Sequence, residues 1–350
     1  MKVIDLTTKP QELHVQFDPS PVYDFLAAMY LVENWMPNEG YEVDRAWVVR
    51  ARAALGPTLR RDLRLFARKG GMLMGAVSLL AQRPGVSIRE FIRAVSGTRP
   101  AVLLERLVTA PHGARTAAPL LSEFLASRKE SALRAYVAEY PREFDRRRLR
   151  VLLTMTPGEA GSRLVDLLKG FYGKVYQREE ETVLPLLRAD IQAKRSLMST
   201  MPASEVVERA TGGYTMSPES GGTHVVLSPS MCFRPYNLLC EYPGVRVYIY
   251  PLDSTTDQEA SPIRELERLF RALSEPTRLR ILQMLADREM YLQEIADHLG
   301  VTHVTAIHHL ARLRAARLVR VVERHHLKHY SLRRETVADV GPRVTKLLLS

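Results

Sequence analysis

The chain has 350 residues, 46% of them hydrophobic and 25% charged, and its 50 Lys and Arg against 39 Asp and Glu give a formal net charge of +11. This composition is typical of a folded chain and excludes wholesale disorder. No run of about 18 apolar residues occurs, which argues against a transmembrane helix. Residues 1–18 also lack the apolar core of a signal peptide. We therefore expect a cytoplasmic protein of two or three domains that does not enter a membrane.

Motifs for catalysis are missing from the sequence. The cysteines, Cys232 and Cys240, are separated by seven residues, which excludes a disulfide framework and a CxxC site. There is no GxSxG, HExxH, GxGxxG or P-loop pattern. The acidic run 179–181 lies on an expected helix, where adjacent side chains diverge, and fits a solvated face better than an acid–base pair. The sequence thus predicts no enzyme, no catalytic residue and no cofactor.

Helical periodicity dominates the first 210 residues. Apolar residues recur at i, i+3, i+4 and i+7, and Pro and Gly separate the periodic segments. Pro185 should kink or break the last of these segments. The expected helices cover residues 20–34, 42–55, 71–82, 87–97, 101–110, 117–140, 142–155 and 158–199. These segments predict a multi-helix N-terminal domain.

Residues 211–252 have a different character, rich in Gly, Pro and Ser with short β-branched and aromatic runs. Segments 224–227 and 245–250 are typical of strands. We expect a small antiparallel β element that completes an N-terminal domain over residues 1–252. The polar segment 253–261 is expected to be a linker.

Positive charge is concentrated in residues 262–350. This segment holds 16 Lys and Arg against 10 Asp and Glu, a net charge of +6, and seven of the ten histidines. Basic clusters favour polyanionic partners, because Lys and Arg that neutralise phosphates release counterions. Two further basic stretches, 41–70 and 128–150, are interpreted either as solvated helix faces or as an extension of a DNA-binding surface.

The elements expected within 262–350 follow a clear order. A helix over 263–273 precedes a second one capped by Ser274 or Glu275. A third helix ends at Gly300, and Thr302 can cap a fourth. Two strand-like runs and a last helix over 334–349 follow. This order predicts a winged helix-turn-helix domain, so the fold class is mainly α, with the small β element in the N-terminal domain.

Three segments carry a family resemblance. LSEPTRLRILQML (273–285), LQEIADHLGVTHVTAIHHLARLRAARLV (292–319) and ERHHLKHYSL (323–332) resemble, in order and spacing, the second helix, the reading helices and the wing of the ArsR (arsenical-resistance-repressor) family of bacterial regulators. The resemblance implies binding to double-stranded DNA. It also implies a homodimer formed by the first and last helices of the domain, where the apolar residues 347–349 suit such contact. The alternative is that the last helix packs on the chain's own helical domain.

Two features argue against metal sensing. Tyr291 and Gln293 stand where metal-sensing members of the family carry their cysteine pair, and the last helix lacks the Asp, His and Glu pairs of zinc-binding members. His325, His326 and His329 could attract zinc or nickel. Adjacent strand residues point to opposite faces, however, so a pH-dependent DNA affinity is the better interpretation. We therefore predict no metal site.

The expected DNA contacts lie on the reading helix and the wing. Leu310 and Leu313 share a face with Ala306 that should pack on Ile295 and Leu299, while His309 should be packed and hydrogen-bonded. Ile307 is expected either to touch a thymine methyl group or to pack. The predicted DNA-binding residues are Thr302, His303, Thr305, His308 and Arg312 of the helix and Arg324, His325 and Lys328 of the wing.

These features predict a sequence-specific transcriptional regulator. We expect a dimeric repressor that binds a near-palindromic operator and is controlled by a small-molecule effector in the N-terminal domain. The alternatives are an enzyme or protein-interaction module with a DNA-tethering domain, and a non-specific architectural DNA binder.

Overall fold

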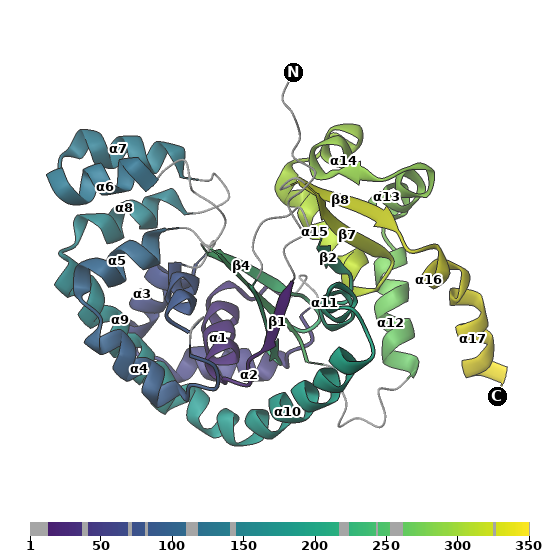
Figure 1. Cartoon of the computed structure of the whole chain (residues 1–350), viewed down its shortest axis with the longest axis horizontal. Helices are drawn as coiled ribbons and strands as arrows, with labels where there is room; N and C mark the ends of the chain where they lie inside the picture. The colour runs from purple at the N-terminus through teal and green to yellow at the C-terminus, as the bar shows by residue number, and fades with distance from the viewer. Residues whose placement is uncertain are drawn as a thin grey trace. The chain divides into compact units, whose positions relative to one another are not determined.

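The computed structural model is mainly helical, with two four-stranded sheets, and divides into two compact units (Figure 1). The first, here called the helical unit, comprises Phe17–Gln192 and Ser228–Asp253. The second, the winged-helix unit, comprises Met1–Gln16, Ala193–Leu227 and Ser254–Ser350. The predicted fold class is confirmed. The structure describes residues 13–36, 41–68, 72–80, 83–109, 118–140, 145–216, 224–242, 244–252, 262–324 and 327–349, so the predicted linker 253–261 lies outside the described residues.

Helices of the first 200 residues follow the predicted segments closely. Local capping fixes several of their starts: Ser87 and Glu90 form a reciprocal capping box, and the Asp145 side chain accepts from the backbone N–H of Arg148. The helices are α1 (Val22–Asn34), α2 (Arg45–Ala54), α3 (Pro57–Ala67), η1 (Met72–Leu79), α4 (Ile88–Gly97), α5 (Pro100–Val108), α6 (Ala118–Ser127), α7 (Glu130–Glu139), α8 (Arg146–Thr154), α9 (Pro157–Phe171), η3 (Tyr172–Tyr176), α10 (Gln177–Arg195) and η4 (Ser196–Ser199).

Several details differ from the expectations. The helix α3 lies outside every predicted segment, and the predicted segment 117–140 forms two helices, α6 and α7. β1 (His14–Phe17) is a strand in a region where the sequence predicted almost none. The segment 72–79 is a 3-10 helix rather than an α-helix. The long segment 158–199 does not end at Pro185, which lies inside α10; a π-helical turn, η3, marks the irregularity instead. Pro185 therefore interrupts the helix less than its missing N–H suggested.

The first sheet has the strand order β1-β3-β5-β4. β3 (His224–Ser230) and β5 (Val245–Pro251) contain the two predicted strand segments, and β4 (Leu238–Tyr242) pairs antiparallel with β5 from Leu238↔Ile249 to Tyr242↔Val245. β-branched and aromatic side chains of β5 are buried, which explains the local strand preference.

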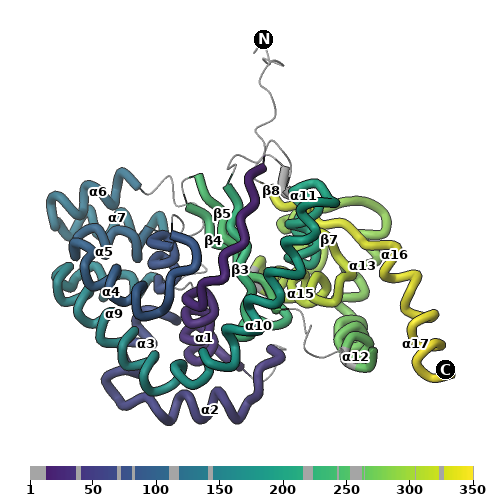
Figure 2. The backbone as a smooth tube through the Cα atoms, turned by 60° about the horizontal axis from the view of Figure 1, so that its bottom comes forward, coloured from purple at the N-terminus to yellow at the C-terminus, as the bar shows by residue number. Residues whose placement is uncertain are grey.

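The second sheet belongs to the winged-helix unit and has the order β2-β7-β8-β6. Its three C-terminal strands are β6 (Met290–Tyr291), β7 (Val319–Arg324) and β8 (Leu327–Leu332), and β7 and β8 form the antiparallel wing. β2 (Tyr214–Met216) joins β7 in parallel, directly after α11 (Ala203–Thr211). Figures 1 and 2 both show α11 beside β7. Part of the predicted N-terminal β element therefore lies in the sheet of the wing.

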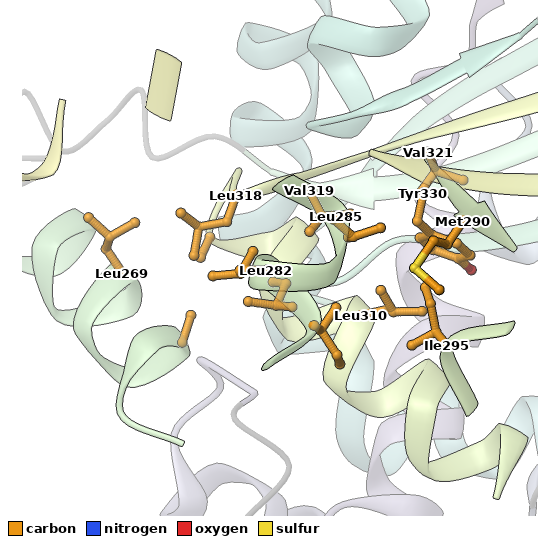
Figure 3. Close-up of a cluster of buried hydrophobic side chains, with 14 of the residues drawn as sticks. Leu269, Leu282, Leu285, Met290, Ile295, Leu310, Leu318, Val319, Val321 and Tyr330 are labelled. Atoms are coloured by element: carbon orange, nitrogen blue, oxygen red, sulfur yellow. The ribbon is translucent and has the colours of Figure 1, made fainter. Parts of the chain in front are cut away.

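Six helices complete the winged-helix fold: α12 (Pro262–Leu273), α13 (Pro276–Asp287), α14 (Leu292–Leu299), α15 (His303–Ala315), α16 (Arg334–Ala338) and α17 (Val340–Leu349). The apolar faces of all these helices except α16 converge with the wing on one core, in which Leu282, Leu285 and Leu310 meet Val319 and Tyr330 (Figure 3). Burial of such side chains is the main stabilising contribution to the fold. None of the described helices has the length and apolar character needed to cross a bilayer.

Candidate nucleic-acid interface

The helix-turn-helix consists of α14, a short turn and α15. Gly300 ends α14 with a φ of 64°, a left-handed conformation in which glycine carries no steric penalty. Thr302 then caps α15, its Oγ1 accepting from the Thr305 N–H at 3.2 Å. Both roles were predicted. They fix the direction in which the recognition helix leaves the turn.

One face of α15 is buried in the winged-helix core. Ala306, Leu310 and Leu313 are buried as predicted, and Leu310 and Leu313 share their cluster with the buried Ile295 and the half-buried Leu299. Because residues 306, 310 and 313 are spaced by three and four, they form one stripe along the helix. This stripe leaves the opposite face free of the core.

The opposite face carries the candidate base contacts. His303 and His308 are exposed, while Thr305 and Arg312 are half-buried. Ile307 is 46% exposed, so the packed alternative for this residue is wrong. A helix entering the major groove presents such side chains to base edges, where imidazole nitrogens can bond purine acceptors and an apolar group can touch a thymine methyl.

The described part of the wing adds Lys328, which is half-buried and lies opposite Glu323 in the β7–β8 register. Arg324 closes β7, and only its backbone is described; His325 and His326 lie outside the described residues. The His329 ring instead lies against the Tyr291 ring, with centroids 4.3 Å apart. Within the described part of the chain, no three His, Cys, Asp or Glu side chains are grouped as metal ligands would be.

His309 is held beside the helix cap of α13. Its Nδ1 lies 3.3 Å from Glu275 Oε2, and the Glu275 carboxylate also accepts the N–H groups of Thr277 and Arg278. Burial lowers the pKa of His309, although the nearby carboxylate opposes this effect. Burial raises the pKa of Glu275, but the hydrogen bonds outweigh burial and lower it overall. His309 is therefore a packed histidine, as predicted.

Arg314 was missed by the sequence analysis. It is only 4% exposed, and it lies eight residues after Ala306 and four after Leu310, on the packed stripe of α15. That spacing was the available signal, since a charge on an apolar stripe needs a partner. The partners are in residues 211–214, about a hundred positions away in sequence.

An apolar surface spans α12 and α17. α17 packs on the core of the winged-helix unit through Val340, Val344 and Leu347. This contact argues against the alternative that the last helix packs on the helical domain. Beyond those contacts Leu348 and Leu349 are 71% and 83% exposed. Phe270 of α12 is 48% exposed, and Arg343 of α17 pairs with Glu265 of α12 at 3.3 Å. The exposed residues Phe270, Leu348 and Leu349 are together called the α12–α17 face, and exposed apolar residues of this kind suit subunit contact.

The helical unit carries an open surface pocket of about 420 Å³ lined by Arg68, Asp145, Arg147, Arg148 and Val151. It brings together arginines from the two basic stretches, 41–70 and 128–150. Arg148 pairs with Asp145 at 2.8 Å, whereas Arg147 is exposed and forms no ion pair with any described residue.

Comparison with known proteins identifies the C-terminal segment. Residues 275–321 match the family described as bacterial regulatory protein, arsR family. The chain is 48% identical over 52 residues to the HTH-type transcriptional regulator KmtR of Mycobacterium tuberculosis, covering 15% of this chain and 40% of the relative. It is also 48% identical over 54 residues to CmtR of Mycobacterium bovis, covering 15% and 46%. The chain therefore spans less than half the length of these relatives.

A longer match extends to most of a related protein. The transcriptional repressor SdpR of Bacillus subtilis is 30% identical over 74 residues, which cover 21% of this chain and 82% of SdpR. Among solved structures, NolR from Sinorhizobium fredii is 25% identical, with 29% of this chain and 97% of NolR covered at a TM-score of 0.22. From the arsR-family match over 275–321 and the coverage of SdpR, the chain belongs to the arsR family of bacterial regulatory proteins.

Proposed function

We propose that this protein is a sequence-specific DNA-binding transcriptional regulator that acts as a dimeric repressor. The observation that carries the proposal is the recognition helix α15, which is capped at Thr302, buried along one stripe and exposed at His303, Ile307 and His308. The related proteins are named as transcriptional regulators and a repressor, which supports the same function. Base contacts from this face would specify sequence, and the wing would add phosphate contacts through Lys328 and Arg324.

The α12–α17 face supports a two-fold dimer. One recognition helix reads only a few base pairs, so two copies related by symmetry give a near-palindromic operator with half-sites about one helical turn apart. Dimer contact through the exposed Leu348 and Leu349 would cover apolar surface that is otherwise open to water.

We place the control of DNA binding in the N-terminal residues. A small-molecule effector that binds one state of the dimer better than the other would shift the spacing of the two recognition helices. The open pocket of the helical unit that Arg68, Arg147 and Arg148 line is the proposed site, because its charge favours an anionic ligand.

The buried polar groups of the helical unit support a non-enzymatic role. Asp24 is fully buried and accepts hydrogen bonds from the Tyr176 and Ser230 hydroxyls and from the Cys232 N–H. Burial raises the pKa of the Cys232 thiol and raises that of Cys240 to about 12. Both thiols thus stay protonated and unreactive at neutral pH, which favours a structural role for this network.

The test is a selection of bound duplexes from a random pool at about 150 mM salt, where phosphate contacts alone bind weakly. Binding is then measured on the selected duplex and on a scrambled control. We expect a near-palindromic winner preferred by at least about a thousandfold. Equal binding to both duplexes with a steep salt dependence would indicate an architectural binder instead. A catalytic activity or protein partner retained after deletion of 262–350 would support the tethered-module alternative.

A further inference from the structure

The segment Ala203–Met216, called the α11–β2 segment, is part of the winged-helix unit although it lies before the first sheet's β3 in sequence. Only residues 217–223 separate its end from β3, which lies between β1 and β5 in the first sheet. In Figures 1 and 2 the segment runs beside the wing strand β7. It is therefore close in sequence to the first sheet and paired in space with the strand β7 of the wing.

β2 covers the edge of the wing. Tyr214, Thr215 and Met216 pair in parallel with residues 321–323, the half of β7 that leads to the wing tip, and the Val321 N–H donates to the Gly213 carbonyl at 2.8 Å. Without β2 these backbone groups of β7 would form a free strand edge. The orientation of the wing is thus fixed partly by a strand from outside the conventional domain.

The same segment holds the C-terminal half of the recognition helix. The buried Arg314 of α15 donates from Nη1 to the Thr211 carbonyl at 3.3 Å, and its guanidinium lies over the Tyr214 ring, 4.5 Å from the centroid. A cation stacked on an aromatic face and desolvated in this way is a favourable contact. Thr211 is itself fixed, because its Oγ1 donates to the Val207 carbonyl and accepts the Tyr214 N–H.

Glu208 of α11 provides the counter-charge for the base of the wing. Its Oε1 accepts from Arg333 Nη2 at 2.8 Å and lies 2.8 Å from Arg320 Nε, without a well-directed hydrogen bond to the latter. Its Oε2 accepts from the Thr215 hydroxyl at 3.2 Å. Both arginines belong to the wing or to its exit, so a single α11 carboxylate connects two ends of the hairpin. Arg320 also pairs with Glu335 at 3.4 Å, an exposed contact made without α11.

The backbone is adapted to this close approach. Gly213 has a φ of 136°, and a Cβ built on it would lie 3.3 Å from the Val319 carbonyl oxygen and 3.2 Å from Arg333 Nη2. A side chain at this position would therefore be strained and would push against the wing. Four kinds of contact thus connect the α11–β2 segment to the wing and to α15: backbone pairing, cation stacking, ion pairing and the close approach at Gly213.

From these contacts we propose that Glu208, Thr211, Gly213 and Tyr214 are positioning residues for DNA reading, which set the angle between the recognition helix α15 and the wing. The proposal rests on the DNA-binding function proposed above. Displacement of β2 would release Arg314 and the edge of β7 together, so a change in this segment would alter DNA affinity. A shift of a packed element between two arrangements is a common form of such coupling.

The test uses the full chain with Glu208→Gln and, separately, Tyr214→Ala. Each variant is compared with wild type for affinity to the selected duplex and to the scrambled one, over a range of salt concentrations. We expect the ratio of the two affinities to fall about tenfold or more, since an arginine pair loses its counter-charge or a buried guanidinium loses its stacking face. The salt dependence should stay unchanged, because no phosphate contact is removed.

Matched controls separate positioning from general damage. Glu335→Gln removes the exposed partner of the same Arg320 and should leave the ratio of the two affinities unchanged. Tyr214→Phe keeps the aromatic ring beneath Arg314 and should also keep the wild-type ratio. A ratio equal to wild type in both Glu208→Gln and Tyr214→Ala overturns the proposal. An equal loss in Glu335→Gln would also overturn it.

Hydrogen exchange tests the proposal independently of DNA sequence. In Glu208→Gln and Tyr214→Ala, amides of 303–324 should exchange faster than in wild type, while those of α13 should not change. If the wild type selects no duplex, the proposed function fails, and the exchange result alone decides the inference. Unchanged exchange over 303–324 would then reject it.

Discussion

Recognition of DNA sequence is proposed to depend on the exposed residues of α15, which are His303, Ile307 and His308. His303 and Ile307 are four residues apart and His308 follows directly, whereas Arg312 lies nearer the helix end and is half-buried. Contacts of the first group to base edges would carry sequence information, and a later arginine would more readily meet phosphate. The two kinds of contact differ in how their loss affects specificity.

The first prediction at this scale concerns His308→Ala. The affinity for the selected duplex should fall about tenfold, because one base contact contributes roughly 1–3 kcal/mol of discrimination, while affinity for scrambled DNA should barely change. Fluorescence anisotropy on both duplexes measures the two constants. His298→Ala is the control, since His298 is also exposed but lies on α14 with its Nδ1 2.8 Å from the Glu294 carbonyl. Parallel losses on both duplexes in His308→Ala would contradict base reading.

His309 predicts a pH dependence of stability. Burial lowers its pKa below the ordinary 6.5, so between those two values the unfolded chain binds the proton and the folded chain does not. The free energy of unfolding should therefore fall as the pH is lowered from about 7.5 through 6.5, and His309→Gln should reduce that slope. Urea denaturation at several pH values measures it, with His298→Gln as the exposed control. If the free energy of unfolding depends on pH equally in wild type and His309→Gln, His309 is not the group responsible.

Residue roles were predictable where their cause is local. The caps at Glu275, Gly300 and Thr302 depend on backbone groups two or three residues away, and the structure confirms each. The environment of Arg314 depends on Thr211 and Tyr214, about a hundred residues earlier in the chain, and no local pattern identifies them. The DNA contacts themselves stay predictions, since they involve a partner molecule.

Elements of the molecule show the same division between local and distant causes. Amphipathic periodicity located nearly every helix, because each helix buries one stripe on a core. β1 is only four residues long, too short for alternation to be visible. β2 has three residues, and its strand conformation is fixed by pairing with β7 about a hundred positions later, so its membership of the wing sheet could not be read from residues 211–252 alone.

At the scale of the whole molecule, the sequence predicted a domain change near residue 253, whereas the compact winged-helix unit also includes Ala193–Leu227. The difference arises from the α11–β2 segment, which adds a strand and a carboxylate to the wing. The winged-helix unit is therefore discontinuous in sequence, and the strand β2 that completes its sheet comes from residues before the C-terminal segment 262–350.

The α12–α17 face gives the prediction for the assembled protein. Replacing both Leu348 and Leu349 by Glu places charges on the most exposed apolar residues of α17, which a subunit interface would have to bury without partners. We expect wild type to elute with the mass of two chains in size-exclusion chromatography with light scattering, and the double variant with the mass of one. Leu327→Glu, at an exposed leucine of β8, is the control and should remain dimeric.

Loss of the dimer should also weaken operator binding. Two linked recognition helices bind two half-sites with the second event intramolecular, which raises overall affinity by about 10²–10⁴ over either half alone. The double variant should lose affinity of that order for the full operator and much less for an isolated half-site, measured by titration of both duplexes. A wild-type monomer, or a double variant that remains dimeric, would place the subunit contact elsewhere. Equal losses on the full operator and the half-site would instead indicate damage to the reading helix.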